Sequence, residues 1–282
     1  MWGVAMTEGC DYSFARPDPR CLFNDGMRFA VRYTSIGSSS KNMTAAEVRR
    51  LLQAGIALVT VFEEAAGHML GGHAAGVDAA KASRDLAGDC GMPSGRPHYF
   101  ALDIDPNPLG DREWDRIKAY LDGAASVLGW SAVGVYGGFR AIEELVPESA
   151  MWGWQTYAWS QGKWSSKAHL QQYKNGVQRC GGEIDLDRTH PDRSITDYGQ
   201  WGLGDIASPE LGGFSMADID VILRRLELMR VGDESGVFNA HDFASLKSVA
   251  MKVDRARDDI DWLRKAVKAI ATATHATLPP ED

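Results

Sequence analysis

Short apolar runs alternate with amphipathic helical patterns over about the first 190 residues, and this alternation constrains the fold more than any other feature. A β-then-α alternation favours a parallel sheet whose strands are joined by helices. About eight strands in this length predict a compact (β/α)8-type TIM barrel in which some helices are short or missing. The first strand is expected to end at Asp11, and the others are expected at Phe29–Tyr33, Ile56–Phe62, His98–Asp103, Val133–Tyr136, Met151–Tyr157, His169–Tyr173 and Glu183–Leu186.

Helix signals fall between several of these runs. Thr44-Ala-Ala-Glu47 is a capping box that predicts a helix start, and Gly55 is a natural stop. Further helices are expected over the Ala-rich segment Ala74–Leu86 and the amphipathic segment Glu113–Leu128.

The aromatic residues divide the chain unevenly, because 22 of the 26 lie in positions 1–201. A stretch rich in glycine and turn formers then predicts a boundary. The expected organisation is a barrel over residues 1–198, a linker over 199–212, and an α-helical, coiled-coil region over 213–282. From Leu246 to Ile270 the apolar positions step alternately by three and four residues, which is a heptad pattern. It fits either one helix packed on its own domain or, as we favour, a homo-oligomer joined through residues 244–274.

Composition excludes several classes of protein and partner. The formal charge of −8 gives no electrostatic reason to expect a nucleic-acid partner. No apolar run is long enough to span a membrane, and no signal-peptide pattern is visible. The four cysteines form no C-x-x-C pair and have no suitably spaced histidine, so we expect neither a metal nor a cofactor. Free, mostly buried thiols are predicted, with a Cys10–Cys21 bridge left open.

A D-x-D pair is the most informative motif. In the segment His98–Pro106, strand alternation places Asp103 and Asp105 on one face at the strand's C-terminal end, which is the active-site mouth of a barrel. Two like charges so close should raise at least one pKa, as a general acid requires. The same motif would also serve a divalent-metal site or a simple strand-end turn.

Other strand ends add acids to the same level of the barrel. Asp11 ends the first strand, Glu63 follows the third, and Asp185 and Asp187 lie in the last. Converging carboxylates suit glycoside hydrolysis, which needs one acid for the leaving oxygen and a second group to support attack at the sugar carbon. Each acid taken singly could instead be a helix cap or a solvated loop charge.

Aromatic residues strengthen the interpretation as a sugar site. Five of them crowd into thirteen residues, and flat apolar faces with polar edges suit sugar rings. We expect Trp152 and Trp154 to divide between the core and the site. The five are Trp152, Trp154, Tyr157, Trp159 and Trp164.

Taken in order, these motifs resemble a known family over about residues 7–190. It is the glycoside-hydrolase-like domain, of unknown function, of actinobacterial secreted proteins and of phage lysins, and it is itself similar to the family 25 lysozymes that cleave peptidoglycan glycan. The motifs are Gly9 with Asp11, Arg32-Tyr33, Glu63, Asp103 with Asp105, Val133–Gly137, Trp152–Gln155, Gln171–Tyr173 and Ile184–Asp187.

The resemblance implies a barrel with its site at the strand ends. Asp103 and Asp105 match the D-x-E pair of the family 25 lysozymes, whose Glu is the general acid; here that position is Asp105. Glu63 could supply the longer acid, or the domain could bind glycan without cleaving it. The implied catalytic set is therefore Asp103, Asp105, Glu63 and Asp11. The expected substrate-binding set is Tyr33, Tyr136, Trp154, Gln155, Gln172 and Asp185.

Three functions compete at this point. The favoured one is a peptidoglycan-degrading glycoside hydrolase of the lysozyme or endolysin type, with bacterial cell-wall glycan as its partner. Such a protein would be phage-encoded and released to the host wall, or cytoplasmic before release. The alternative is a non-catalytic wall-binding module on an oligomeric helical stalk, such as a phage structural component. A metal-dependent phosphoesterase using Asp103, Asp105 and Asp11 is the weakest, because no histidine lies in the acidic cluster.

Overall fold

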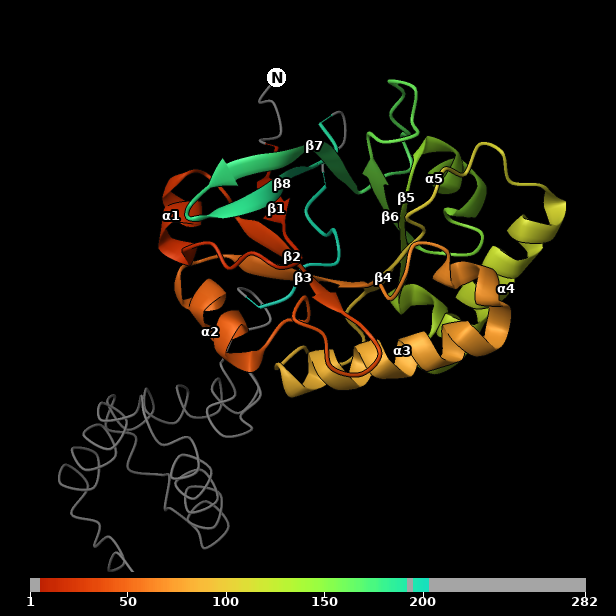
Figure 1. Ribbon diagram of the computed structural model, residues 1–282, viewed down its shortest axis with the longest axis horizontal. Coiled ribbons are helices and arrows are strands. Elements are labelled where there is room, and N and C mark those ends of the chain that lie inside the picture. The colour runs from red at the N-terminus through yellow and green to blue at the C-terminus, as the bar shows by residue number, and fades with distance from the viewer. Residues whose placement is uncertain (1–5, 192–194, 203–282) are drawn as a thin grey trace, which may run out of the picture. The chain divides into compact units, whose positions relative to one another are not determined.

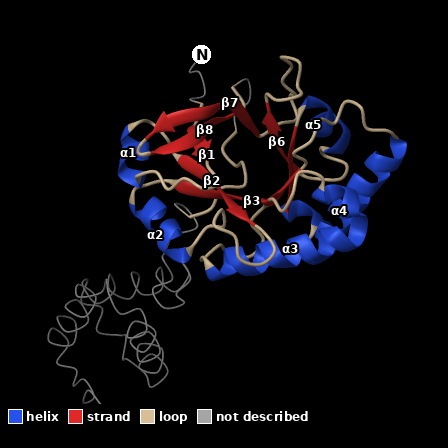
Figure 2. Cartoon of the chain, in the orientation of Figure 1, coloured by secondary structure: helices blue, strands red, loops and turns tan. Residues whose placement is uncertain are grey.

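Eight strands close into a barrel in chain order, from β1 round to β8 (Figures 1 and 2). The computed structural model describes residues 6–191 and 195–202, all within one compact unit of the chain, Met1–Asp205. The strands are β1 (Glu8–Asp11), β2 (Phe29–Thr34), β3 (Ala57–Phe62), β4 (His98–Ala101), β5 (Val133–Gly137), β6 (Trp152–Thr156), β7 (Leu170–Arg179) and β8 (Gly182–Thr189).

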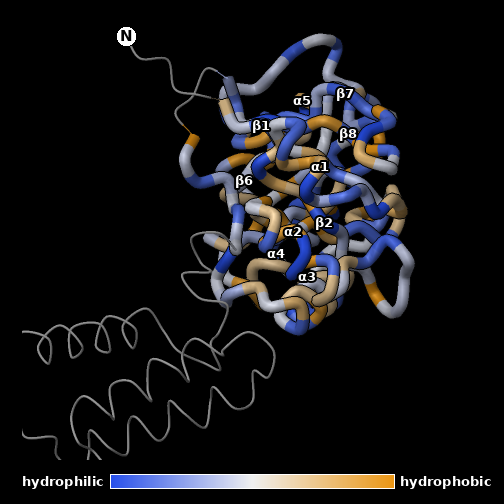
Figure 3. The backbone as a smooth tube through the Cα atoms, turned by 90° about the vertical axis from the view of Figure 1, so that its left-hand side faces the viewer, coloured by the Kyte–Doolittle hydropathy of each residue, from blue (hydrophilic) through white to orange (hydrophobic). Residues whose placement is uncertain are grey.

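Helices follow only the first five strands in the described part of the chain. They are α1 (Pro19–Asn24), α2 (Ala45–Gln53), α3 (Gly72–Asp89), α4 (Asp111–Leu128) and α5 (Phe139–Leu145), with short 3-10 turns at His68–Gly71 and Trp130–Ala132. Colouring by hydropathy shows apolar residues both in the strands and in the helices that cover them (Figure 3). The predicted mixed α/β barrel is confirmed, but the full (β/α)8 pattern is not.

The last strand is the main departure from a TIM barrel. Strands β1 to β7 are parallel to their neighbours, whereas β8 is antiparallel to both β7 and β1. The two residues between β7 and β8, Cys180 and Gly181, both have positive φ angles, of 53° and 82°. Two such residues form the tight turn of a β-hairpin, so the chain reverses here without a helix. Sequence alternation could not reveal this reversal, because a buried strand has the same pattern in either direction.

Local signals explain the helices that do form. The Thr44 side chain accepts a hydrogen bond from the Glu47 N–H at the start of α2, as the capping box predicts. Gly55, with φ of 86°, follows its end. Helices α3 and α4 pack so closely that a Cβ on Gly76 would lie 1.9 Å from the Tyr120 carbonyl oxygen. Only glycine permits this close approach of the two helices.

The segment 195–202 packs against the barrel near the amino-terminal ends of β2 and β3. Trp201 is 1% exposed, pairs with Leu58 in β3, and donates its indole N–H to Thr60 at 2.9 Å. The Tyr198 ring lies 4.9 Å from that of Phe29. Trp201 therefore belongs to the barrel rather than to a linker beginning at residue 199. The helices and coiled coil expected over 213–282 lie outside the described residues.

A disulfide joins Cys21 in α1 to Cys180 in the hairpin turn, while Cys10 and Cys90 are free. The expectation of four free thiols was therefore wrong for Cys21 and Cys180, and the partner of Cys21 is not Cys10. The two bonded residues are 159 positions apart, so only the closure of the barrel reveals that they meet. No helix among the described residues is long and apolar enough to cross a membrane.

Candidate active site

The carboxyl ends of the parallel strands bring acids and hydrogen-bonding side chains together over the barrel core. Asp11 is the last residue of β1, and it lies in register with Asp185 on the antiparallel β8. Tyr33 of β2 and Gln172 of β7 reach the same position from either side. The tyrosine O–H donates to Asp11 Oδ1 at 2.8 Å, and the amide of Gln172 donates to Asp11 Oδ2 at 2.7 Å. Four strands thus converge on one carboxyl.

Asp11 is almost completely buried, with 2% of its surface exposed. Burial, followed by the charge of Asp185, raises its pKa from 3.8 to about 7, although the bonds from Gln172 and Tyr33 oppose the rise. Burial and the charge of Asp11 also raise the pKa of Tyr33 well above its ordinary value. Tyr33 therefore stays neutral and donates a hydrogen bond to Asp11.

The same network continues to β5 and β8 through Gln172. The Tyr136 hydroxyl donates to the side-chain oxygen of Gln172, Oε1, at 2.9 Å, and the side-chain Nε2 of Gln172 also donates to Asp185 Oδ2 at 3.3 Å. Asp185 accepts a second bond from the Gly176 N–H at 2.7 Å. Burial raises the pKa of Asp185, an effect that the Gly176 bond opposes. Gln172 therefore fixes the relative positions of two acids and a tyrosine.

Asp187 also belongs to this network, although neither the expected catalytic set nor the expected substrate-binding set includes it. It is fully buried, and the indole N–H of Trp154 donates to its Oδ1 at 2.8 Å. Its Oδ2 is buried without a donor from the rest of the described chain. Burial, followed by the charge of Asp11, raises the pKa of Asp187 well above its ordinary value, although the bond from Trp154 opposes the rise. The Trp154 indole is thus the hydrogen-bond donor that holds this buried carboxyl in place.

The sequence did contain the signal for Asp187. Residues two apart on a strand point to the same face, so a strand that turns Asp185 inward also turns Asp187 inward. The same rule corrects the expected division of the two tryptophans. Trp152 and Trp154 both pack in the interior cluster of the barrel, with Trp154 against Tyr136 at 4.4 Å and Trp152 against His169 at 4.9 Å.

A second, more exposed acidic group lies beside this network. Glu63 follows β3 and forms an ion pair with Lys41 at 2.9 Å. Lys41 Nζ lies 5.9 Å from the centre of the Tyr33 ring, and the Tyr33 hydroxyl bonds to Asp11, so Tyr33 neighbours both groups. Burial, then the charge of Glu63, raises the pKa of Asp103, while Lys41 lowers it. Asp103 is only partly buried and is therefore an acid with a raised pKa that solvent can reach.

The structure does not bring Asp105 into this group in the way the D-x-D pattern predicts. Strand β4 ends at Ala101, so Asp103 and Asp105 lie in the following loop and strand alternation no longer relates them. The Asp105 side chain is exposed and accepts hydrogen bonds from both the backbone and the side-chain amide of Asn107, at 2.9 and 2.7 Å. Asp105 therefore forms a turn after the end of the strand, which is one of the alternatives that the D-x-D motif left open.

Gln155 also lies apart from the acids. It is fully buried, and its amide donates to Ser160 Oγ at 3.1 Å and to the Lys163 carbonyl at 2.8 Å. Its own carbonyl oxygen accepts from the Ser165 N–H at 2.8 Å. Gln155 points away from Trp154 because adjacent strand residues face opposite sides. It holds the loop that follows β6.

The arrangement can perform proton transfer. Two buried carboxyls, Asp11 and Asp187, form its floor, and Asp103, Glu63 and Asp185 are within reach of solvent above it. Among the residues that the structure describes, no three His, Cys, Asp or Glu side chains are placed to hold a metal ion.

Comparisons with known proteins agree with this architecture. A curated relative is Rv2525c of Mycobacterium tuberculosis, described as a candidate peptidoglycan hydrolase; it is 29% identical over 189 residues, covering 61% of this chain and 74% of the relative. The crystal structure of the Tat-secreted Rv2525c in complex with L-tartrate matches with a TM-score of 0.64 and 25% identity, over 70% of this chain and 100% of that one. A second crystal structure of Rv2525c, in complex with HEPES, matches with a TM-score of 0.61 and 25% identity, over 69% of this chain and 98% of that one.

The family model for this group covers residues 20–194, which include every strand except β1. The chain belongs to the Rv2525c-like, glycoside hydrolase-like domain family.

Proposed function

We propose that this protein is a peptidoglycan hydrolase-like enzyme that cleaves the glycan of the bacterial cell wall with Asp103 as proton donor. The observation that carries the proposal is the pairing of Asp103 with Glu63 at the barrel mouth. Burial, and then the charge of the ion-paired Glu63, raises the pKa of Asp103, which favours the protonated form of Asp103 close to the Glu63 carboxyl. Glycoside hydrolysis requires such a pair.

Each residue of the site has a distinct part in the proposal. Asp103 protonates the departing glycosidic oxygen, and Glu63, held by Lys41, supports attack at the sugar carbon. Asp185 contacts the sugar from the opposite strand. Asp11, only 2% exposed, holds Tyr33 and Gln172 in position beneath the substrate.

The exposed rim supports a saccharide substrate. Phe14, in the loop after β1, is 68% exposed, and Tyr157, just after β6, is 46% exposed. Aromatic faces left in solvent at the carboxyl ends of barrel strands suit stacking against sugar rings. The mycobacterial relative is described as a candidate peptidoglycan hydrolase, which supports the same substrate class here.

The decisive assay is the release of soluble reducing sugar from purified peptidoglycan. Asp103→Asn should reduce the rate by about 100-fold or more, which is the usual loss on removing a general acid. The matched control is Asp105→Asn, two residues away in the same loop, which should retain activity. An inactive Asp105→Asn with an active Asp103→Asn would return the acid role to Asp105, as the family motif implies.

A non-catalytic wall-binding module is the second candidate, favoured by the absence of a Glu at position 105. Wild-type protein that co-sediments with walls of several types but releases no sugar would establish it. We also propose delivery as a phage lysin and association of copies through residues 244–274. Light scattering on the intact chain and on one truncated near residue 210 tests the association, and two monomers would refute it.

A further inference from the structure

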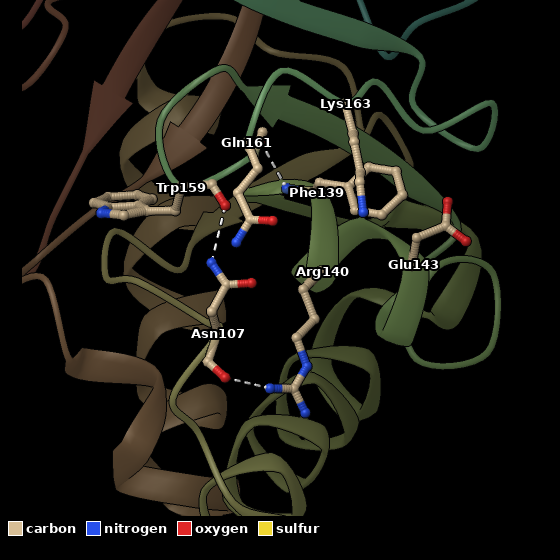
Figure 4. Close-up of a pocket in the computed structure, with 8 residues that line it drawn as sticks. Asn107, Phe139, Arg140, Glu143, Trp159, Gln161 and Lys163 are labelled. Carbon is tan, nitrogen blue, oxygen red and sulfur yellow. Dashed lines mark hydrogen bonds between the residues drawn. The ribbon is translucent and has the colours of Figure 1, made fainter.

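A pocket beside the barrel mouth has no part in the function proposed above. Its cavity volume is about 220 Å³, and it lies between helix α5 and the loops that follow β4 and β6 (Figure 4). Drug-sized ligands need roughly 300–1,000 Å³, so this cavity suits one sugar residue or a short branch. The side chains that matter below are Asn107, Phe139, Arg140, Trp159, Gln161 and Lys163.

We propose that this pocket is an accessory subsite that binds a carboxylate-bearing, acylated sugar unit of the glycan and thereby sets which bond lies at Asp103. The inference rests on the proposed function, because it takes the glycan as substrate. It assigns a binding role to the loop after β6, which the acidic network does not use.

The pocket is held in shape before any ligand arrives. Ser160 Oγ donates to the Thr156 carbonyl at 2.6 Å and accepts from the Phe139 N–H at 2.9 Å. Buried Gln155 bonds to the same loop at both ends, as described above. Trp159 and Gln161 have φ angles of 56° and 52°, which non-glycine residues rarely adopt. A loop fixed this firmly loses little freedom on binding a ligand.

The charges of the pocket favour an anion. Lys163 is exposed, and among the described residues its ammonium forms no ion pair; it lies 5.6 Å from the centre of the Phe139 ring. Arg140 is engaged, because its guanidinium donates to the carbonyl oxygen of Asn107 at 2.6 Å. The one acid of the pocket, Glu143, accepts a hydrogen bond from the Ser165 hydroxyl. Lys163 is thus the cation that is available to a ligand.

Neutral donors and aromatic surface complete the recognition of an acylated sugar. Gln161 is exposed, and its amide points into the middle of the pocket, towards Asn107 (Figure 4). Phe139 lies beneath Lys163, and the Trp159 indole is on the opposite side (Figure 4). An amide for an acyl group, aromatic faces for a ring and a cation for a carboxylate are the three groups that such a unit requires.

The subsite lies within reach of the catalytic acids. Asn107 bonds to Asp105 through its side-chain amide at 2.7 Å and to the Trp159 carbonyl at 3.0 Å, so it links the mouth loop to the pocket. It is four residues from Asp103, and four residues span at most about 14 Å. The mouth is acidic and repels a carboxylate, whereas the pocket offers Lys163. A glycan carrying carboxylates on alternate sugars would therefore bind in one register.

The test measures binding of small sugars by NMR titration of the full chain. The probes are N-acetylmuramic acid, which carries a lactyl carboxylate, muramyl dipeptide, whose carboxylate lies on the peptide, and neutral N-acetylglucosamine. Lys163→Gln should weaken binding of at least one acidic probe about five-fold, and the probe affected identifies whether the lactyl group or the peptide supplies the carboxylate. Binding of N-acetylglucosamine should be unchanged, and Lys81→Gln on α3 is the matched control.

Two outcomes overturn the inference, and neither depends on catalysis. Equal affinity of wild type and Lys163→Gln for both acidic probes would refute it, as would chemical-shift changes that avoid residues 157–163. If either occurs while Asp103→Asn still abolishes sugar release, the accessory subsite fails and the hydrolase stands. If Lys163→Gln weakens acidic-probe binding but wild type releases no sugar, the subsite stands and the hydrolase fails.

Discussion

Asp11→Asn should make the barrel less stable in acid and more stable in mild base than the wild type. Folding raises the pKa of Asp11 from 3.8 to about 7. Between these two pH values the folded carboxyl keeps its proton and the unfolded one does not, so stability falls as pH rises through this window. At about 1.4 kcal/mol per pKa unit, the wild type loses about 4 kcal/mol of unfolding free energy from this residue.

Asp11→Asn removes this pH-dependent loss of unfolding free energy, but it also lowers the unfolding free energy by an amount that does not depend on pH. Its amide oxygen can still accept from Tyr33, but its NH2 group would face the donating amide of Gln172. Two opposed donors in a buried site cost about 1–3 kcal/mol at every pH. The curves of the two proteins should therefore cross, with the variant weaker at pH 4 and about 1–3 kcal/mol stronger at pH 8.

Urea unfolding followed by tryptophan fluorescence measures this difference, since eight of the nine tryptophans lie in residues 1–201. The quantity to compare is the difference in unfolding free energy between the variant and the wild type at each pH, because other groups also titrate in both proteins. Burial lowers the pKa of His98 from 6.5 to about 4, so stability gained from that residue rises with pH between those values. The curve of unfolding free energy against pH for Asp105→Asn, a substitution at an exposed position, should be parallel to that of the wild type. Parallel curves for Asp11→Asn would show that Asp11 titrates normally and would refute the reasoning.

Three further substitutions test other parts of the structure by the same unfolding assay. Trp154→Phe removes the donor to buried Asp187 and should cost about 2–4 kcal/mol, whereas Trp152→Phe, whose indole donates to the Ser131 carbonyl, should cost less; equal losses would contradict the role of Asp187. Cys21→Ser removes the disulfide to Cys180 and should lower the unfolding free energy by about 3–5 kcal/mol. Reducing agent should cause a similar loss in the wild type and no further loss in the variant. Gln155→Ala breaks three hydrogen bonds to the loop after β6 and should cost about 2–4 kcal/mol, and an unchanged stability would show that the loop does not depend on it.

The sequence by itself determined the order and position of the strands and most of the residues that meet at the mouth. Apolar runs mark buried strands whatever their partners, and the carboxyl ends of parallel strands share one edge, so the pattern predicts that Asp11, Tyr33, Glu63 and Tyr136 lie at the mouth. Gln172 was expected there only from the family resemblance. The capping box at Thr44 likewise acts within a few residues and was predicted from them.

Only the tertiary structure decided what depends on contacts between distant segments. The end of β4 at Ala101 separates Asp103 from Asp105, because the chain leaves the sheet there and Asp105 bonds to Asn107 instead. The reversal at Cys180 and Gly181 makes β8 antiparallel and brings Cys180 to Cys21. The raised pKa values of Asp11 and Asp187 come chiefly from their burial and then from charges on neighbouring strands, a property that no stretch of sequence carries alone.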